Sequence, residues 1–275
     1  MKRILITALV CAVIVTTLTV LSVFDFGYRE LIYTLVSIGL FVFGSIFLKL
    51  LTPKVRAIRF FKFFPLQKGD FSVLLSMTFL VISGGFLFNL LTIWLLGFFG
   101  VAVPAGEYTW MSTDSLWLSI MTIAVVPAIS EEIFFRGAVL AALSKEKTVA
   151  AVLVSSLFFA IVHGTWYYFL SNFYAGIVFA IMIYVTNSIF VSMTAHFINN
   201  IMSVMLFVYS NRLTVVGLDS VMIWLLIFVF LVSLYFAVGA CAKRLSVNVK
   251  SEKPIINEGE LLWLKEQEKK QARDK

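Results

Sequence analysis

Long apolar stretches separated by short polar segments make up most of the chain. A transmembrane α-helix needs about 20 predominantly apolar residues to cross a hydrocarbon core of roughly 30 Å. Windows of this length predict eight spans, which cover residues 4–24, 31–51, 71–99, 115–143, 148–165, 166–187, 189–209 and 221–242. Seven is the main competing number, since only Gly164 and an aromatic run at 166–168 separate the fifth span from the sixth. The pattern predicts an all-α fold, a polytopic membrane helical bundle of about eight transmembrane helices.

The composition agrees with a membrane protein. Hydrophobic residues make up 61% of the 275 positions, Phe alone occupies 28, and only 13% are charged. A soluble core of this length cannot bury that much apolar surface, so most of it must face lipid. We expect two N-terminal helices and a basic cytoplasmic loop over residues 1–70, a six-helix core over 71–242 and a charged cytoplasmic tail over 243–275.

The basic residues predict how the chain lies in the membrane. Lys and Arg in short loops stay on the cytoplasmic side. With the N-terminus inside, every Lys and Arg except Arg29, Arg136 and Arg212 falls on that side. This favours eight spans with both termini in the cytoplasm, and it explains the net charge of +7 by topology rather than by nucleic-acid binding. In the loop 52–70, basic residues alternate with Phe, a pattern suited to an anionic inner leaflet, so membrane lipids are expected partners.

Five Glu, Arg and His side chains lie deep within the fourth to eighth predicted spans, where each is energetically expensive and marks a candidate functional site. These residues are Glu131, Glu132, Arg136, His163 and His196. Residues four apart share a helix face, so Arg136 lies beside Glu132, whereas Glu131 is turned about 100° away. Glu132 and Arg136 can therefore neutralise each other and brace the helix. Glu131, partly desolvated, is suited to act as a general base near neutral pH.

Two further pairs at helical spacing follow. Phe159 and His163 share one face of the fifth span, and His196 and Asn200 share one face of the seventh. His196 and Asn200 are two donors that can converge on an oxygen developing negative charge, whereas Asn199 points elsewhere. Each pair alone is equally typical of structural hydrogen bonding between membrane helices. Together the groups supply a carboxylate, an imidazole and a donor pair, as needed for hydrolysis of an acyl bond by water.

The chain resembles a known family on these residues. The motifs EExxxR, FxxxH and HxxxN occur in order, beginning at Glu131, Phe159 and His196. They are typical of the CPBP intramembrane proteases, which include the type II CAAX prenyl endopeptidases and bacteriocin-immunity relatives. The resemblance covers about residues 71–210, which makes 71–242 the expected catalytic core. One departure is that Gly176 is followed four residues later by Ala180, where members often have a Gly-rich helix.

The resemblance implies a role for each matching residue. Glu131 and His163 correspond to the pair that activates the attacking water. His196 and Asn200 correspond to the oxyanion hole. Glu132 and Arg136 correspond to a supporting ion pair, and Phe159 to a supporting pocket wall.

The use of a metal is left open by the sequence. Glu131, His163 and His196 can supply the three protein ligands of a catalytic divalent metal such as zinc, although no HExxH motif is present. The alternative is a reaction without a cofactor, in which Glu131 is the base. The second is favoured, because Glu131 as a ligand leaves only Glu132 as a base, and Glu132 is already engaged with Arg136.

The expected function is that of an intramembrane endopeptidase that cleaves a membrane-associated peptide or protein substrate, which can be lipidated. The alternatives are a catalytically silent membrane scaffold or immunity factor of the same family and, third, a proton-coupled transporter. Compact loops and the lack of a C-terminal retention signal favour a multi-pass protein of a bacterial plasma membrane.

One geometric difficulty accompanies this hypothesis. A rise of about 1.5 Å per residue places Glu131 and His196 in the cytoplasmic half of the membrane but His163 some 20 Å from the inner end of its helix. The fifth span must be tilted, displaced or differently bounded for the three to meet. We also expect a water-filled cavity that opens towards the cytoplasm, since hydrolysis needs water at the site.

Overall fold

The structure is a computed structural model, and it describes residues 2–23, 29–52, 56–101, 116–143, 148–164, 166–210 and 220–250. In these ranges all regular secondary structure is helical. The longer helices are α1 (Lys2–Val23), α2 (Arg29–Leu50), α4 (Asp70–Phe98), α8 (Thr148–Val162), α9 (Phe169–Thr186), α10 (Ile189–Ser210) and α11 (Ser220–Lys250). Short helices are α3 (Ala57–Phe60) and η4 (Trp166–Tyr168). Residues 116–143 form one span built from α5 (Leu116–Ser119), η2 (Ile120–Val125), α6 (Val126–Glu131), η3 (Glu132–Val139) and α7 (Leu140–Leu143).

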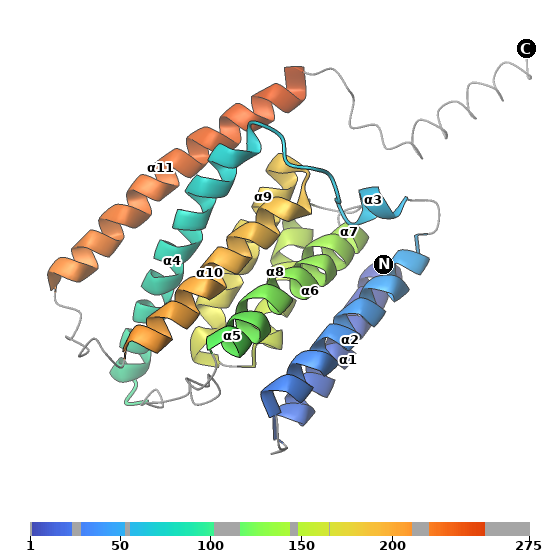
Figure 1. Cartoon of the computed structure of the whole chain (residues 1–275), viewed down its shortest axis with the longest axis horizontal. Coiled ribbons are helices and arrows are strands. Elements are labelled where there is room, and N and C mark those ends of the chain that lie inside the picture. The colour runs from blue at the N-terminus through green and yellow to red at the C-terminus, as the bar shows by residue number, and fades with distance from the viewer. Residues whose placement is uncertain are drawn as a thin grey trace, which may run out of the picture.

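The predicted all-α polytopic membrane bundle is confirmed. Six helical segments of the described chain are long and apolar enough to cross a membrane. Two more apolar helices, Leu5–Leu21 and Thr148–Val162, are shorter and coincide with the first and fifth expected spans. Successive long helices run in alternating directions, and the start of α1 lies at the same end of the bundle as the end of α11 (Figure 1). This is the arrangement expected for an even number of crossings.

The helical hairpin α1–α2 packs against the rest of the bundle through one face. On α1 the buried positions are Thr7, Cys11, Ile14 and Leu18, which repeat at intervals of three and four residues. On α2, Gly44 lies so close to the core that a Cβ there would be 2.7 Å from the ring of Phe134. The hairpin therefore contacts the helix that carries Glu131 and Glu132 directly.

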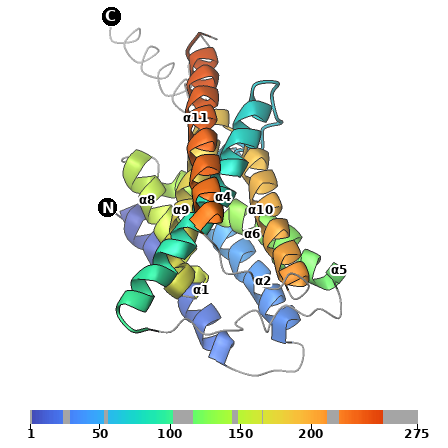
Figure 2. The ribbon, with the colours of Figure 1, turned by 90° about the vertical axis from the view of Figure 1, so that its left-hand side faces the viewer.

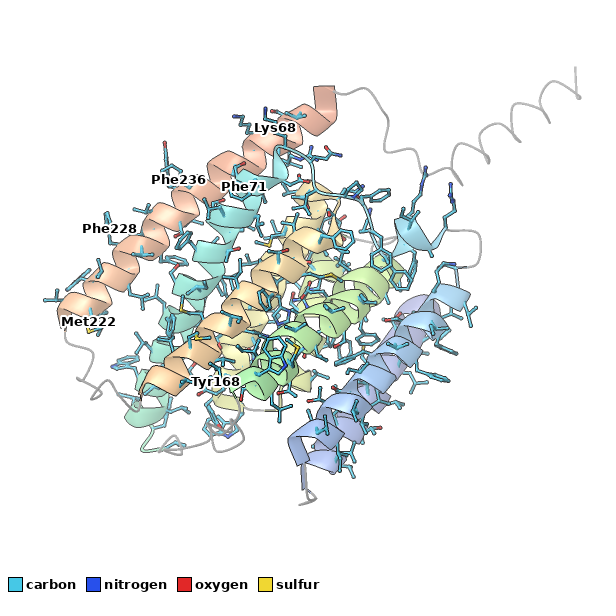
Figure 3. All side chains as sticks on the ribbon, in the orientation of Figure 1. Lys68, Phe71, Tyr168, Met222, Phe228 and Phe236 are labelled. Carbon is cyan, nitrogen blue, oxygen red and sulfur yellow. The ribbon has the colours of Figure 1, made fainter. Side chains whose placement is uncertain are left out.

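Helix α11 lies on the outside of the bundle beside α4 (Figures 1 and 2). Phe228 and Phe236 point away from the bundle (Figure 3) and are 62% and 60% exposed, as expected for side chains that face lipid. The helix continues to Lys250, beyond the expected end of the span at residue 242, so the first residues of the expected tail belong to α11. The rest of that tail, 251–275, and Arg212 lie outside the described residues.

The basic loop between α2 and α4 packs onto the end of the bundle. The side chain of Phe60 is 3% exposed, and Phe61 lies against Gly137, where a Cβ would be 2.8 Å from the ring. The backbone of Lys62 accepts a hydrogen bond of 3.0 Å from the amide of Ile189, the first residue of α10. The sequence predicted that the aromatic residues of this loop lie on the lipid surface. For Phe60 that prediction is wrong, because its side chain is buried, and Phe61 packs against Gly137 in η3.

Candidate active site

Glu131, His163 and His196 meet at one place in the bundle. The Oε2 atom of Glu131, at the end of α6, lies 3.9 Å from Nε2 of His163 and 4.0 Å from Nε2 of His196. His163 follows the last residue of α8, and His196 lies in α10. Gaps of this length are too long for direct hydrogen bonds, but one water molecule with ordinary hydrogen bonds spans them.

The depths of the three residues agree once the helix ends are known. Glu131 lies about 18 Å before the end of α7, and His163 about 22 Å after the start of α8. Since residues 144–147 join these two helix ends, the two side chains reach similar depths. The loop that carries Lys62 covers the start of α10. His196 therefore lies deeper in the membrane than its distance from the start of α10 alone suggests.

The imidazole of His163 is oriented by the backbone. Its Nδ1 lies 2.7 Å from the carbonyl oxygen of Phe159, one helical turn earlier. Because a carbonyl only accepts hydrogen bonds, Nδ1 must carry the proton of the neutral ring. Nε2, the atom that faces Glu131, is then an acceptor in the neutral form.

The imidazole of His196 is oriented by Glu132. Its Nδ1 lies 3.0 Å from Oε1 of Glu132, and the same oxygen lies 3.1 Å from NH1 of Arg136. The ion pair predicted from the four-residue spacing is therefore present. The bond from His196 to Glu132 was missed, because no local pattern relates residues on two different helices.

Burial divides the site into an enclosed part and a reachable part. Glu132, Arg136 and His196 are at most 2% exposed. By contrast, the side chains of Glu131 and His163 are 13% and 29% exposed. Within the described residues, Oε2 of Glu131 has no hydrogen-bond partner. A solvent molecule or substrate that reaches the site therefore meets Glu131 and His163 first.

Two buried phenylalanine rings support the charged groups. The ring of Phe159 lies 4.1 Å from Cζ of Arg136, and its centroid lies 4.6 Å from that of His163. The expected supporting role of Phe159 thus has a physical basis in cation–π and ring contacts. Phe179 on α9 stacks on His196 with centroids 4.9 Å apart and was missed by the sequence analysis. Its position becomes visible only when α9 packs beside α10.

The close approach of α9 to α8 depends on a small residue. A Cβ at Gly176 would lie 2.9 Å from Cβ of Ser156, and Arg136 donates a long hydrogen bond of 3.4 Å to the carbonyl of Gly176. Gly176 therefore serves the close helix packing expected of this segment, although the helix is not Gly-rich.

Asn200 is bound to the backbone of a neighbouring helix. Its Nδ2 donates a hydrogen bond of 2.9 Å to the carbonyl oxygen of Ile123 in η2. Its Oδ1 accepts a weaker bond of 3.3 Å from Nδ2 of Asn199. An amide nitrogen has two hydrogens, so the bond to Ile123 uses one of them. The four-residue spacing predicted that Asn200 lies beside His196, and nothing in the sequence pattern predicted this bond.

The arrangement of the candidate ligands does not fit a bound metal. Tetrahedral zinc with bonds of about 2.0–2.1 Å holds its ligand atoms roughly 3.3 Å apart. The two nitrogens lie 3.9 and 4.0 Å from Oε2 of Glu131. In the described part of the chain, no group of three or more His, Cys, Asp or Glu side chains could hold a metal ion. No step below is derived through a metal.

Comparison with protein families gives one match. Residues 113–202 match the family model described as type II CAAX prenyl endopeptidase Rce1-like. This region carries all three motifs and confirms the family resemblance. Neither the curated proteins nor the solved structures give a match to the chain. The chain is thus a membrane protein in which residues 113–202 are similar to the CAAX protease family.

Proposed function

We propose that the protein is an intramembrane endopeptidase that hydrolyses a peptide bond of a membrane-associated substrate. The observation that carries the proposal is the position of Glu131. Among the described residues its Oε2 atom has no hydrogen-bond partner, and it faces Nε2 of both histidines at 3.9 and 4.0 Å, while the side chain as a whole is 13% exposed. A carboxylate placed in this way has the capacity to bind and deprotonate one water molecule.

The reaction begins with that water between Glu131 and His163. One hydrogen of the water points to Oε2 of Glu131 and the other to Nε2 of neutral His163, which leaves an oxygen lone pair for the substrate carbonyl. Glu131 takes the first proton as the new carbon–oxygen bond forms. When the carbon–nitrogen bond breaks, the protonated Glu131 returns this proton to the leaving nitrogen, and the products are a carboxylic acid and an amine.

The oxyanion of the intermediate is stabilised by His196 and Asn200. As an imidazolium, His196 donates from Nδ1 to Glu132 and from Nε2 to the oxyanion. The bond of 3.0 Å to Glu132 fixes the orientation of the ring, and Arg136 pairs with the same buried carboxylate. Asn200 contributes the amide hydrogen that Ile123 does not use.

The proposed setting is the plasma membrane of a bacterium, with both termini in the cytoplasm. The substrate is a peptide or membrane-protein segment, with or without a lipid. We predict that the substrate reaches Glu131 and His163 through a water-filled cavity that opens towards the cytoplasm. The rival proposals are a silent scaffold or immunity factor and a proton-coupled transporter.

Cleavage of a membrane-associated peptide library by the purified protein in detergent tests the proposal. The wild type should cut at least one peptide, Glu131→Gln should cut none, and a chelator should leave the wild-type rate unchanged. Ser203→Ala is a matched control, because this exposed side chain on α10 bonds only within its own helix, to the carbonyl of Asn199. A wild type that cuts nothing favours the scaffold. Inhibition by the chelator contradicts the metal-free reaction, and proton flux in liposomes that Glu131→Gln abolishes favours the transporter.

A further inference from the structure

A proline interrupts the helix just before Glu131. Pro127 lies four residues before Glu131 and has no backbone N–H. In an α-helix, the carbonyl of residue 123 accepts its hydrogen bond from the amide of residue 127. The carbonyl of Ile123 therefore lacks the donor that an α-helix would give it, in a membrane interior where no bulk water can replace it.

The side chain of Asn200 takes the place of that donor. Nδ2 of Asn200 lies 2.9 Å from the carbonyl oxygen of Ile123, an ordinary hydrogen-bond length. Asn199 donates to Oδ1 of the same amide at 3.3 Å, which helps to fix its orientation. The acceptor that Pro127 leaves open is thus bound by a residue of a different helix.

The backbone around Pro127 departs from α-helical geometry. Residues Ile120–Val125 form a π-helical turn, and the amide of Val126 bonds to the carbonyl of Met121, five residues earlier. Such turns are rare, and they often lie at functional sites. The bond from Asn200 ends within this turn, so it holds the segment that leads directly into Glu131.

The two helices joined by this bond carry two of the reacting groups. Asn200 lies one turn after His196 on α10, and Ile123 lies two turns before Glu131. We propose that Asn200 is a positioning residue that replaces the N–H missing at Pro127 and thereby holds Glu131 at its distance from His196. The inference rests on the proposed function for its kinetic effect, but the hydrogen bond itself can be tested without activity.

A double-mutant cycle between Asn200 and Pro127 tests this inference. Asn200→Ala should lower the midpoint of thermal unfolding by roughly 2–4 °C. It should also lower kcat on the order of 10- to 100-fold at nearly unchanged KM, because a reacting group is displaced and the amide hydrogen proposed for the oxyanion is lost, so the midpoint rather than kcat tests the hydrogen bond to Ile123. In Pro127→Ala, residue 127 regains its N–H, so adding Asn200→Ala should cause a clearly smaller loss of the midpoint. Ser203→Ala should have little effect in either background.

An equal loss of the midpoint in both backgrounds overturns the inference. Should Pro127→Ala not fold, Asn200→Asp decides, because a carboxylate keeps the shape and the acceptor for Asn199 but loses the donor. Its midpoint should fall at least as far as that of Asn200→Ala, and an unchanged midpoint overturns the inference. A wild type that cuts no peptide contradicts the proposed protease function, while the thermal cycle still decides whether Asn200 replaces the missing N–H.

Discussion

The bundle contains two buried ion pairs that differ in how completely their polar atoms are hydrogen-bonded. At the junction of α4 and α11, Asp70 and Arg244 are 0% and 5% exposed and bond at 2.6 Å between Oδ1 and Nε. Gln67 completes the network, since its backbone N–H donates to Oδ2 of Asp70 at 2.8 Å and its side-chain Oε1 accepts from NH2 of Arg244 at 2.7 Å. Both carboxylate oxygens of Asp70 are thus bound, and the network joins α4 to α11.

The pair of Glu132 and Arg136 is equally buried but belongs to an incomplete network. Among the described residues, Nε of Arg136 and Oε2 of Glu131 have no hydrogen-bond partner. The network continues through His196 to the partly exposed Glu131. Buried polar groups without partners are uncommon in folded proteins and call for an explanation. The comparison teaches that a buried ion pair alone does not distinguish the two networks; the proposed reacting groups adjoin the one that has polar atoms without partners.

The largest expected effect is a loss of kcat on replacing His163, the more exposed of the two histidines near Glu131. His163→Ala should lower kcat by about 10²- to 10⁴-fold, because the water loses one of the two groups that orient it. Since His163 is partly exposed, the midpoint of thermal unfolding should stay close to that of the wild type. Steady-state cleavage and thermal unfolding of the same preparation measure both. A rate close to that of the wild type would exclude His163 from the reaction.

Breaking the Asp70–Arg244 pair should instead reduce stability and leave the cleavage rate unchanged. Arg244→Met leaves the buried Asp70 without its cation and should reduce the free energy of unfolding by about 3–5 kcal/mol. The cleavage rate per folded molecule should not change, because Arg244 bonds to Asp70 and Gln67 at the junction of α4 and α11 rather than to the proposed reacting groups. Lys243→Met, at an exposed neighbouring position, is the matched control. A variant that is fully stable, or stable but inactive, would contradict the separation of the two networks.

An intermediate effect is expected from the ring that stacks on His196. Phe179→Leu keeps most of the apolar volume but removes the aromatic face, and it should lower kcat on the order of 2- to 10-fold. Phe173→Leu on the same helix is the control, because Phe173 stacks on Phe169. Equal rates for these two variants would show that the contact with His196 has no part in catalysis.

The smallest effect concerns a lysine outside the membrane. Burial, and then the charge of Arg59, lower the pKa of Lys62 below its ordinary value of 10.5. Between the lowered pKa and 10.5 the unfolded chain binds more protons than the folded one, so this group makes stability rise with pH. The stability of the wild type relative to Lys62→Met should therefore increase as the pH approaches 10.5. If the thermal unfolding midpoints of the wild type and Lys62→Met change in parallel with pH, the effect is refuted.

The sequence was informative where the relation between residues is local. The four-residue spacing predicted the contact of Glu132 with Arg136 and the separate direction of Glu131, because both depend on helix geometry alone. The contacts of His196 with Glu132 and of Phe179 with His196 join different helices and have no local signal. The hydrophobic pattern also does not distinguish a π-helical turn from an α-helical one. For that turn the signal was Pro127, which marks where regular hydrogen bonding must fail.

The central claim is that Glu131 and His163 act on one water molecule, and a double-mutant cycle on kcat tests it most directly. We compare the wild type, Glu131→Gln, His163→Ala and the double variant on one membrane-associated peptide at equal concentrations of folded protein. Residues that act as a unit have strongly non-additive effects. The double variant should therefore be no slower than the slower single variant. Losses that multiply in the double variant would show that the two residues act independently and would contradict the account.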